Sequence, residues 1–202
     1  MFFLFGESVK THRNQTGMRR CDTCGGDKDF FHVTEVNYFS LFSIPLFEVS
    51  KVADYFLCGG CETSYASKDQ IQPAHIEPVK IVIAYILAGY GRAGDTRHAQ
   101  EIARAIGGIV FAVEEIEGTL RLIGEEDVLE LLGRAASSMN PKAKFQVMQA
   151  AFLSVYVCCE MQYEDRLRIN LMGNALGVSL TFVEAAMQNV RTNSYYGVRR
   201  LF

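Results

Sequence analysis

The sequence predicts an α+β protein of two domains: a small antiparallel β domain followed by an all-α bundle of about six or seven helices. Three observations support this. Two Cys-x-x-Cys pairs bracket a stretch rich in aromatic and β-branched residues, which favours strands. Prolines and polar residues then break the pattern between Ser67 and Pro78. From Val79 onward, apolar residues recur at three- and four-residue steps, which indicates helices.

Composition and charge limit the classes of partner. The 202 residues are 49% hydrophobic and 21% charged, with a formal net charge of −3, so the chain can bury a core in one large or two small domains. Residues 1–75 carry seven basic and nine acidic side chains, and residues 76–202 carry thirteen and fourteen. Neither part offers the basic stripe that phosphate backbones require, which argues against a nucleic-acid partner.

The sequence also bears on the compartment. No apolar run approaches the roughly 20 residues that span a bilayer, and the first residues lack the basic region and cleavage site of a signal peptide. We therefore expect a cytoplasmic protein without a transmembrane segment, and peripheral membrane association stays open. Thiols are kept reduced in that compartment, where paired cysteines indicate metal or redox chemistry rather than structural disulfides.

The β domain is predicted to consist of strands between two cysteine turns. Residues 6–20 are polar and suggest an extended or loop approach to the first turn, after which Gly25 and Gly26 permit a tight backbone. Residues 30–42 have strand composition, and Pro45 is expected at a bend or an edge. A last short strand over residues 54–57 leads directly into Cys58.

The four cysteines of the two turns form a predicted metal site. Two pairs separated by roughly 30 residues are typical of a tetrahedral zinc site with ligands Cys21, Cys24, Cys58 and Cys61. Four thiolates leave no coordination position for water, so the zinc is expected to be structural. A redox Cys-x-x-Cys usually opens a helix after a strand, which fits this context less well. Binding energy of about 10–16 kcal/mol in peptide models would stabilise a domain whose own core is small.

A family resemblance follows from these motifs. The opening Met-Phe-Phe-Leu-Phe-Gly, the first Cys-x-x-Cys, the Leu-Phe-Ser-Ile-Pro-Leu-Phe segment at 41–47, Lys51 and the closing Tyr-Phe-Leu-Cys-Gly-Gly-Cys resemble the bacterial zinc-ribbon 15 family. The resemblance covers about residues 1–65. It implies a rubredoxin-like metal site and brings no settled biochemical activity.

The domain boundaries follow from the change in pattern. We expect a zinc ribbon over residues 1–69, a linker over 70–78, a helical domain over 79–192 and a C-terminal tail over 193–202.

Capping signals divide the helical domain. The first helix is expected over residues 79–91, and Asp95 is a plausible N-cap for the next, over residues 96–106. Acidic residues 125–127 precede an apolar pattern, as expected at a helix N-terminus. Asn140-Pro141 has the form of a cap followed by a first-turn proline. Ser179 or Thr181 is expected to begin the last helix.

The helical domain resembles the tellurite-resistance protein B (TerB-like) domain. The resemblance lies in a central apolar helix ending at Cys158-Cys159-Glu160, then Glu164, then a helix that closes with residues 175–179. Family members carry an acidic pair after the central helix that is suspected of binding a divalent cation. The resemblance therefore implies a weak Ca²⁺ or Mg²⁺ site at Glu160, Glu164 and Asp165, against the alternative of a solvated helix boundary. Cys158 and Cys159 lie in an apolar run and are expected to pack as small buried hydrophobes.

No catalytic constellation is recognisable, and we expect no enzyme. The favoured function is a zinc-binding adaptor whose ribbon and TerB-like module contact protein partners, with a bacterial stress response as the expected setting. One alternative is a helical module that senses a divalent cation. The other is a nucleic-acid-binding ribbon that uses Arg13, Arg19 and Arg20 beside the first cysteine pair.

Overall fold

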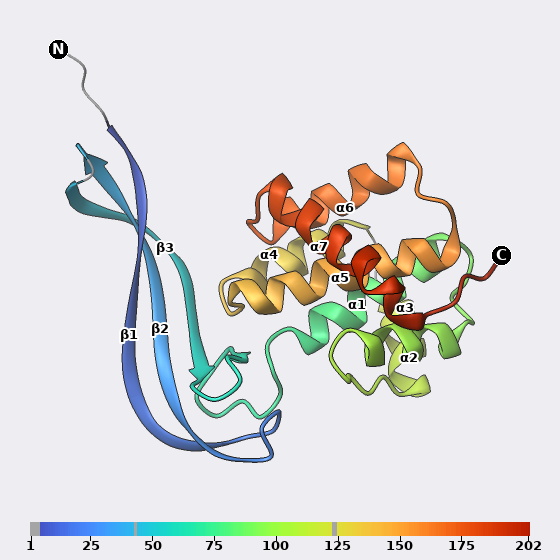
Figure 1. Ribbon diagram of the computed structural model, residues 1–202, viewed down its shortest axis with the longest axis horizontal. Coiled ribbons are helices and arrows are strands. Elements are labelled where there is room, and N and C mark those ends of the chain that lie inside the picture. The colour runs from blue at the N-terminus through green and yellow to red at the C-terminus, as the bar shows by residue number, and fades with distance from the viewer. Residues whose placement is uncertain (1–4, 43, 123–124) are drawn as a thin grey trace. The chain divides into compact units, whose positions relative to one another are not determined.

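The computed structural model describes residues 5–42, 44–122 and 125–202, and it confirms the α+β fold class (Figure 1). Residues 1–4, at the start of the predicted ribbon, lie outside the described ranges. By internal contacts the chain forms two units. Unit 1 comprises residues 1–74 together with Ser137–Lys142, and unit 2 comprises residues 75–136 and 143–202.

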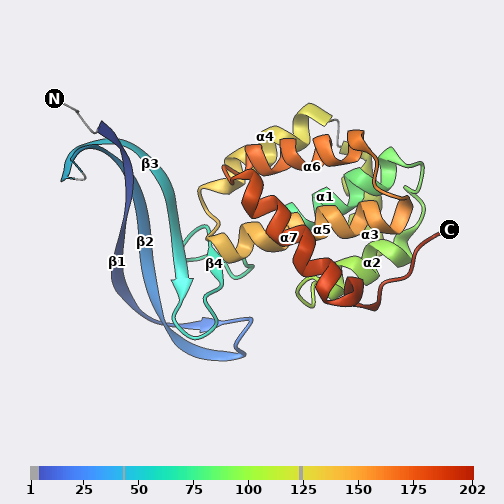
Figure 2. The ribbon, with the colours of Figure 1, turned by 45° about the horizontal axis from the view of Figure 1, so that its top comes forward.

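Unit 1 is built on a four-stranded antiparallel sheet in the order β1-β2-β3-β4. The strands are β1 (Phe5–Cys21), β2 (Gly26–Leu41), β3 (Ile44–Cys58) and the two-residue β4 (Ser64–Tyr65). Both views show β1, β2 and β3 running side by side and curling along their length (Figures 1 and 2). The segment predicted as an extended or loop approach is therefore a long strand.

The curl has a local cause in the pairing of β2 with β3. Three register shifts leave Leu46, Val49 and Val52 without a direct partner on β2. Each is a β-bulge, which adds one residue to the strand and increases its twist. Pro45 pairs with Ser40 on a part of β3 that β4 does not cover, in agreement with the predicted edge position.

Unit 2 is helical, and its helix boundaries agree with most of the capping signals. The helices are α1 (Ile76–Gly89), α2 (Thr96–Ala105), α3 (Val113–Leu122), α4 (Glu125–Ala136), α5 (Pro141–Cys158), α6 (Tyr163–Ala175) and α7 (Leu180–Thr192), followed by a short turn (Ser194–Gly197) whose residues have positive φ. Asp95 caps α2 and Ser179 caps α7 through their side chains. Thr181, the other predicted start of the last helix, lies inside α7.

One boundary differs from its expected position, and the predicted C-terminal tail makes contacts with the helices. Helix α1 begins at Ile76, inside the predicted linker, and Pro78 occupies its first turn, where the missing N–H breaks no helical hydrogen bond. The C-terminal segment packs against the bundle, because Leu201 N donates to Val157 O at 2.9 Å and Tyr195 stacks on Tyr156 with ring centroids 3.6 Å apart.

The core of unit 2 surrounds α5, of which most residues from Val147 to Val157 are buried. Helix α1 packs against α2, α3 and α4, and α6 packs against α4 and α7. Within the described ranges, no single helix has the length and apolar composition needed to cross a membrane. Helices α6 and α7 meet these two criteria only when they are taken together, and the pair is bent by 119°.

Candidate metal centre

The sheet brings the four predicted ligands to one end. Cys21 ends β1 and pairs with Gly26, so the first Cys-x-x-Cys is itself the turn between β1 and β2. Cys58 ends β3 and pairs with Phe30, so the second occupies the turn between β3 and β4. Because antiparallel strands reverse direction at each turn, the β1–β2 and β3–β4 turns lie at the same end of the sheet.

The two turns have matching backbone geometry. Gly25 N donates to Cys21 O at 2.9 Å, and Glu62 N donates to Cys58 O at the same distance. The residue after each second cysteine is left-handed, with φ of +70° at Gly25 and 58° at Glu62. This conformation strains the Glu62 backbone by about 1–3 kcal/mol, and surrounding contacts must offset that energy. Gly60 N also lies 3.4 Å from Cys58 Sγ and donates to it.

The sulfur atoms form a compact cluster. All four Sγ atoms lie within 4.8 Å of one another, with 3.6 Å between Cys21 and Cys61 and 3.8 Å between Cys24 and Cys58. A tetrahedron with metal–sulfur bonds of about 2.3 Å has edges of about 3.8 Å. A disulfide would require about 2.05 Å, and the cysteines are free thiols. The donor set therefore fits a tetrahedral metal ion such as zinc.

The cluster is enclosed on one side by the core of unit 1. Cys21 and Cys58 are fully buried and pack with Phe30 and Tyr65. The Tyr65 hydroxyl lies 3.2 Å from Cys21 Sγ, and Thr63 Oγ1 lies 3.2 Å from Cys61 Sγ. The Tyr65 hydroxyl stabilises negative charge on Cys21, whereas the Cys61 thiol donates to Thr63, and both contacts hold the sulfurs in orientation.

The pKa values of the thiols show why a cation suits this cluster. Burial raises the pKa of Cys21, but hydrogen bonds from Tyr65 and from the backbone of Cys24 outweigh it and bring the pKa to about 6. The hydrogen bond with Cys61, and then burial, raises the pKa of Cys24 to about 12, and burial raises the pKa of Cys58. One thiolate therefore forms readily, whereas further negative charges beside it are opposed. A divalent cation removes that opposition when it binds.

The glycines of the second turn allow the close approach of neighbouring groups. A Cβ on Gly59 would lie 2.9 Å from Phe31 Cε2 and 3.1 Å from Asp29 O. A Cβ on Gly60 would lie 3.3 Å from Cys24 Sγ. Gly59 N also donates to Asp29 O at 2.8 Å, which fixes the turn to β2.

The segment Ser137–Lys142 is a part of unit 1 that the sequence did not predict. Lys142 Nζ donates to Cys61 O at 2.8 Å, and Asn140 Nδ2 donates to Glu62 O at 2.8 Å. Ser64 Oγ contacts both the side chain and the backbone N of Asn140 at 3.3 Å. The second cysteine turn thus has partners about 80 positions later in the chain, and no local sequence signal marks such a contact.

The predicted acidic site has a different arrangement. Asp165 is buried and serves in a capping box at the start of α6, where its carboxylate accepts from Gln162 N at 2.9 Å. It also accepts hydrogen bonds from the Tyr90 hydroxyl and the Cys159 thiol. Glu160 and Glu164 are exposed. Among the described residues, only the four cysteines form a group of three or more metal-ligating side chains, so the cation site stays a prediction without support from the geometry.

Two of the arginines considered for nucleic-acid binding, and the first of the paired cysteines in the helical unit, have defined surroundings in the structure. Arg13 and Arg19, named for nucleic-acid binding, stack over Phe31 and Phe30 with their guanidinium carbons 3.7 and 4.4 Å from the ring centroids. Arg19 also donates to Gln70 O at 2.6 Å. Cys158 is half-buried, and burial raises its pKa to about 12, which keeps it an unreactive thiol.

Comparisons of the chain with protein-family models, with curated proteins and with solved structures find no match. The zinc-ribbon and TerB-like resemblances accordingly rest on the sequence motifs alone.

Proposed function

We propose that this protein is a non-enzymatic adaptor in which a zinc-stabilised ribbon and a TerB-like helical module present surfaces to protein partners. The observation that carries the proposal is the cluster of four cysteine sulfurs within 4.8 Å of one another at the turns of unit 1. The stress-response setting is the part of the proposal that rests on the TerB-like resemblance.

The donor set supports a structural rather than a catalytic role for the metal. Cys21, Cys24, Cys58 and Cys61 would supply all four ligands, so no coordination position is left for a substrate or an activated water. The metal would supply stability by joining the β1–β2 turn to the β3–β4 turn. The Tyr65 and Thr63 hydroxyls beside Cys21 and Cys61 help to hold the sulfurs.

The sheet supports a role in protein contact. Large apolar side chains at the end of the β2–β3 hairpin are exposed, among them Phe42, Ile44 and Phe47, each with more than half of its surface accessible. Exposed apolar groups gathered on one element are typical of interaction sites.

The proposal is tested by affinity capture of the tagged full chain from bacterial cells after cross-linking, with Cys58→Ser as the matched variant. We expect a reproducible set of proteins with the metal-loaded chain and loss of that set with the variant, while circular dichroism shows that the helices persist. If the wild-type chain enriches no protein over a tag-only control, or if Cys58→Ser captures the same set, the adaptor proposal is wrong.

A further inference from the structure

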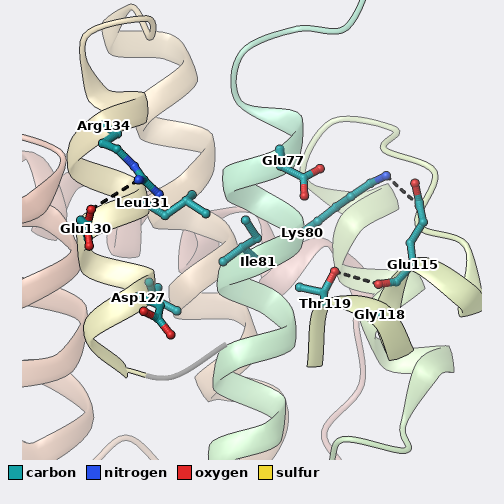
Figure 3. Close-up of a pocket in the computed structure, with 11 residues that line it drawn as sticks. Glu77, Lys80, Ile81, Glu115, Gly118, Thr119, Asp127, Glu130, Leu131 and Arg134 are labelled. Carbon is teal, nitrogen blue, oxygen red and sulfur yellow. Dashed lines mark hydrogen bonds and ion pairs between the residues drawn. The ribbon is translucent and has the colours of Figure 1, made fainter. Parts of the chain in front are cut away.

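Two hollows in the helical unit carry opposite charge. One lies between α1, α3 and α4 and has a volume of about 560 Å³ (Figure 3). Its two basic side chains are both paired, Lys80 with Glu115 at 2.8 Å and Arg134 with Glu130 at 3.3 Å. Two further carboxylates, Glu77 and Asp127, also line it, so this hollow is acidic like the chain as a whole.

The other hollow is strongly basic. It has a volume of about 660 Å³ and lies between α2 and the C-terminal segment after α7. Its charged lining consists of four arginines and one carboxylate: Arg97, Arg104, Arg199, Arg200 and Glu101. With His98 neutral, the lining carries a formal charge of +3 in a chain whose net charge is −3. Like charges around one hollow repel each other, and a bound anion would relieve this repulsion.

The acids near these arginines do not balance them. Arg97 Nε pairs with Glu101 Oε1 at 3.0 Å, and Arg200 Nη1 lies 3.6 Å from Glu160 Oε1. For Arg104 and Arg199, both exposed, the described residues provide no carboxylate partner within 4.0 Å. Two guanidinium groups are thus available to bind a ligand from opposite sides of the hollow.

The two arginines of the C-terminal segment follow a strained stretch of backbone. Ser194, Tyr195 and Tyr196 are all left-handed, with φ of 51°, 53° and 52°, and Gly197 continues the turn at 73°. A non-glycine residue in this region is strained, and such residues cluster at ligand clamps and active sites. Three such residues follow one another here.

Specific contacts hold the strained turn in place. The Tyr195 ring stacks on Tyr156 with an interplanar angle of 8°. The Tyr196 hydroxyl donates to Asn189 Oδ1 at 2.8 Å and accepts from Gln149 Nε2 at 2.9 Å. Val198 is buried directly before the two arginines. These contacts fix the backbone that places Arg199 and Arg200 opposite α2.

We propose that this hollow binds a small molecule that carries two or more phosphate groups. Guanidinium groups bind phosphate oxygens through paired, charge-assisted hydrogen bonds, and a ligand with at least two phosphates matches a lining of +3. A small molecule fits better than a polynucleotide, because the four arginines surround a single hollow on a chain whose net charge is negative, rather than forming a long basic stripe. This site is independent of the adaptor proposal.

The experiment is isothermal titration of the metal-loaded full chain in phosphate-free buffer at low ionic strength. The probes are inorganic triphosphate, pyrophosphate, orthophosphate, citrate, ATP and a short single-stranded oligonucleotide. We expect triphosphate to bind more tightly than pyrophosphate and both to bind more tightly than orthophosphate, with affinity falling as salt is added.

The variants are Arg104→Gln and Arg199→Gln, with Arg166→Gln on an exposed part of α6 as the matched control. Each hollow variant should lower triphosphate affinity at least about tenfold, because a charge-assisted contact is lost, and the control should bind like the wild type. Both substituted arginines are exposed, and circular dichroism of each variant confirms that it folds.

Four results would each overturn the proposal. The first is no binding of triphosphate at low salt, and the second is unchanged affinity in both hollow variants. The third is an equal loss in Arg166→Gln, which would show non-specific charge attraction. The fourth is tighter binding of citrate or of the oligonucleotide than of triphosphate or ATP, which would assign the hollow to a different class of ligand.

Discussion

At the scale of single residues, the metal centre depends on how closely neighbouring groups approach the second cysteine turn. A Cβ on Gly59 would lie 2.9 Å from Phe31 Cε2, so a neighbouring group would have to shift, and a Cβ on Gly60 would press on Cys24 Sγ at 3.3 Å. The glycines therefore have a steric role as well as a conformational one. The Cys-x-x-Cys spacing alone predicts the four ligands, but not which glycine is indispensable, because that depends on β2.

Gly59→Ala tests this steric role. The added methyl would contact Phe31 Cε2 at 2.9 Å and backbone at 3.1 Å, so we expect the metal-loaded ribbon to lose about 1–3 kcal/mol of unfolding free energy and to release its metal faster to a chelator. Gly26→Ala is the control, because a Cβ at Gly26 meets no atom within 4 Å. Equal effects of the two substitutions in denaturant titrations would contradict the steric explanation.

The N-cap of α2 gives a prediction for acid pH. Burial raises the pKa of Asp95, but hydrogen bonds from the His98 side chain and backbone, at 2.8 and 3.2 Å, outweigh it and hold the pKa below its usual value. The cap therefore stabilises the fold above the unfolded-state pKa of about 3.9, and this contribution is lost as the pH falls through the lower folded-state pKa.

The measurement is the unfolding free energy of wild type and Asp95→Asn from about pH 6 down to about pH 2. The wild type should be more stable at the upper end, and the difference should shrink as the acid is protonated. A difference that stays constant across this range would show that the carboxylate charge contributes nothing.

At the scale of elements, local signals in the sequence predicted more than long-range contacts did. The caps Asp95 and Ser179 and the start of α5 at Pro141 were predicted, because each depends on a few adjacent residues. The full length of β1 was not, because most of its side chains are exposed and its sequence lacks the alternation that marks a half-buried strand. The hydrogen bond of Asp165 with Tyr90 was also missed, since the two residues are 75 positions apart.

The segment Ser137–Lys142 contributes to unit 1 through contacts with the second cysteine turn, and a substitution at Asn140 tests that contribution. Asn140→Ala removes the hydrogen bond to Glu62 O and the contact with Ser64 Oγ in a buried setting, so we expect unit 1 to lose about 1–3 kcal/mol. Asn174→Ala, at an exposed position of α6, is the control. Thermal unfolding of the metal-loaded variants checks this, and equal melting temperatures would contradict it.

At the scale of the whole molecule, the protein consists of two units with different sources of stability. Unit 2 has a large apolar core around α5, whereas unit 1 has two small buried clusters next to its cysteines. The chain crosses between the units more than once, because Ser137–Lys142 belongs to unit 1 and α5 continues into unit 2.

Removal of the metal should therefore destabilise unit 1 more than unit 2. After treatment with a zinc chelator, we expect amide hydrogen exchange to accelerate over β1 to β4 and over residues 137–142, while α5 from Ala143 onward, α6 and α7 keep their protection. Uniform loss of protection, or none in the strands, would show that the metal does not stabilise unit 1 in particular.

In the proposed metal centre, four cysteine thiolates hold one structural metal ion. X-ray absorption spectroscopy of the purified full chain, with metal content measured on the same sample, tests it most directly. We expect about one metal per chain, with four sulfur ligands at about 2.3 Å. Nitrogen or oxygen atoms in the first coordination shell, or metal well below one per chain with the cysteines oxidised to disulfides, would contradict it.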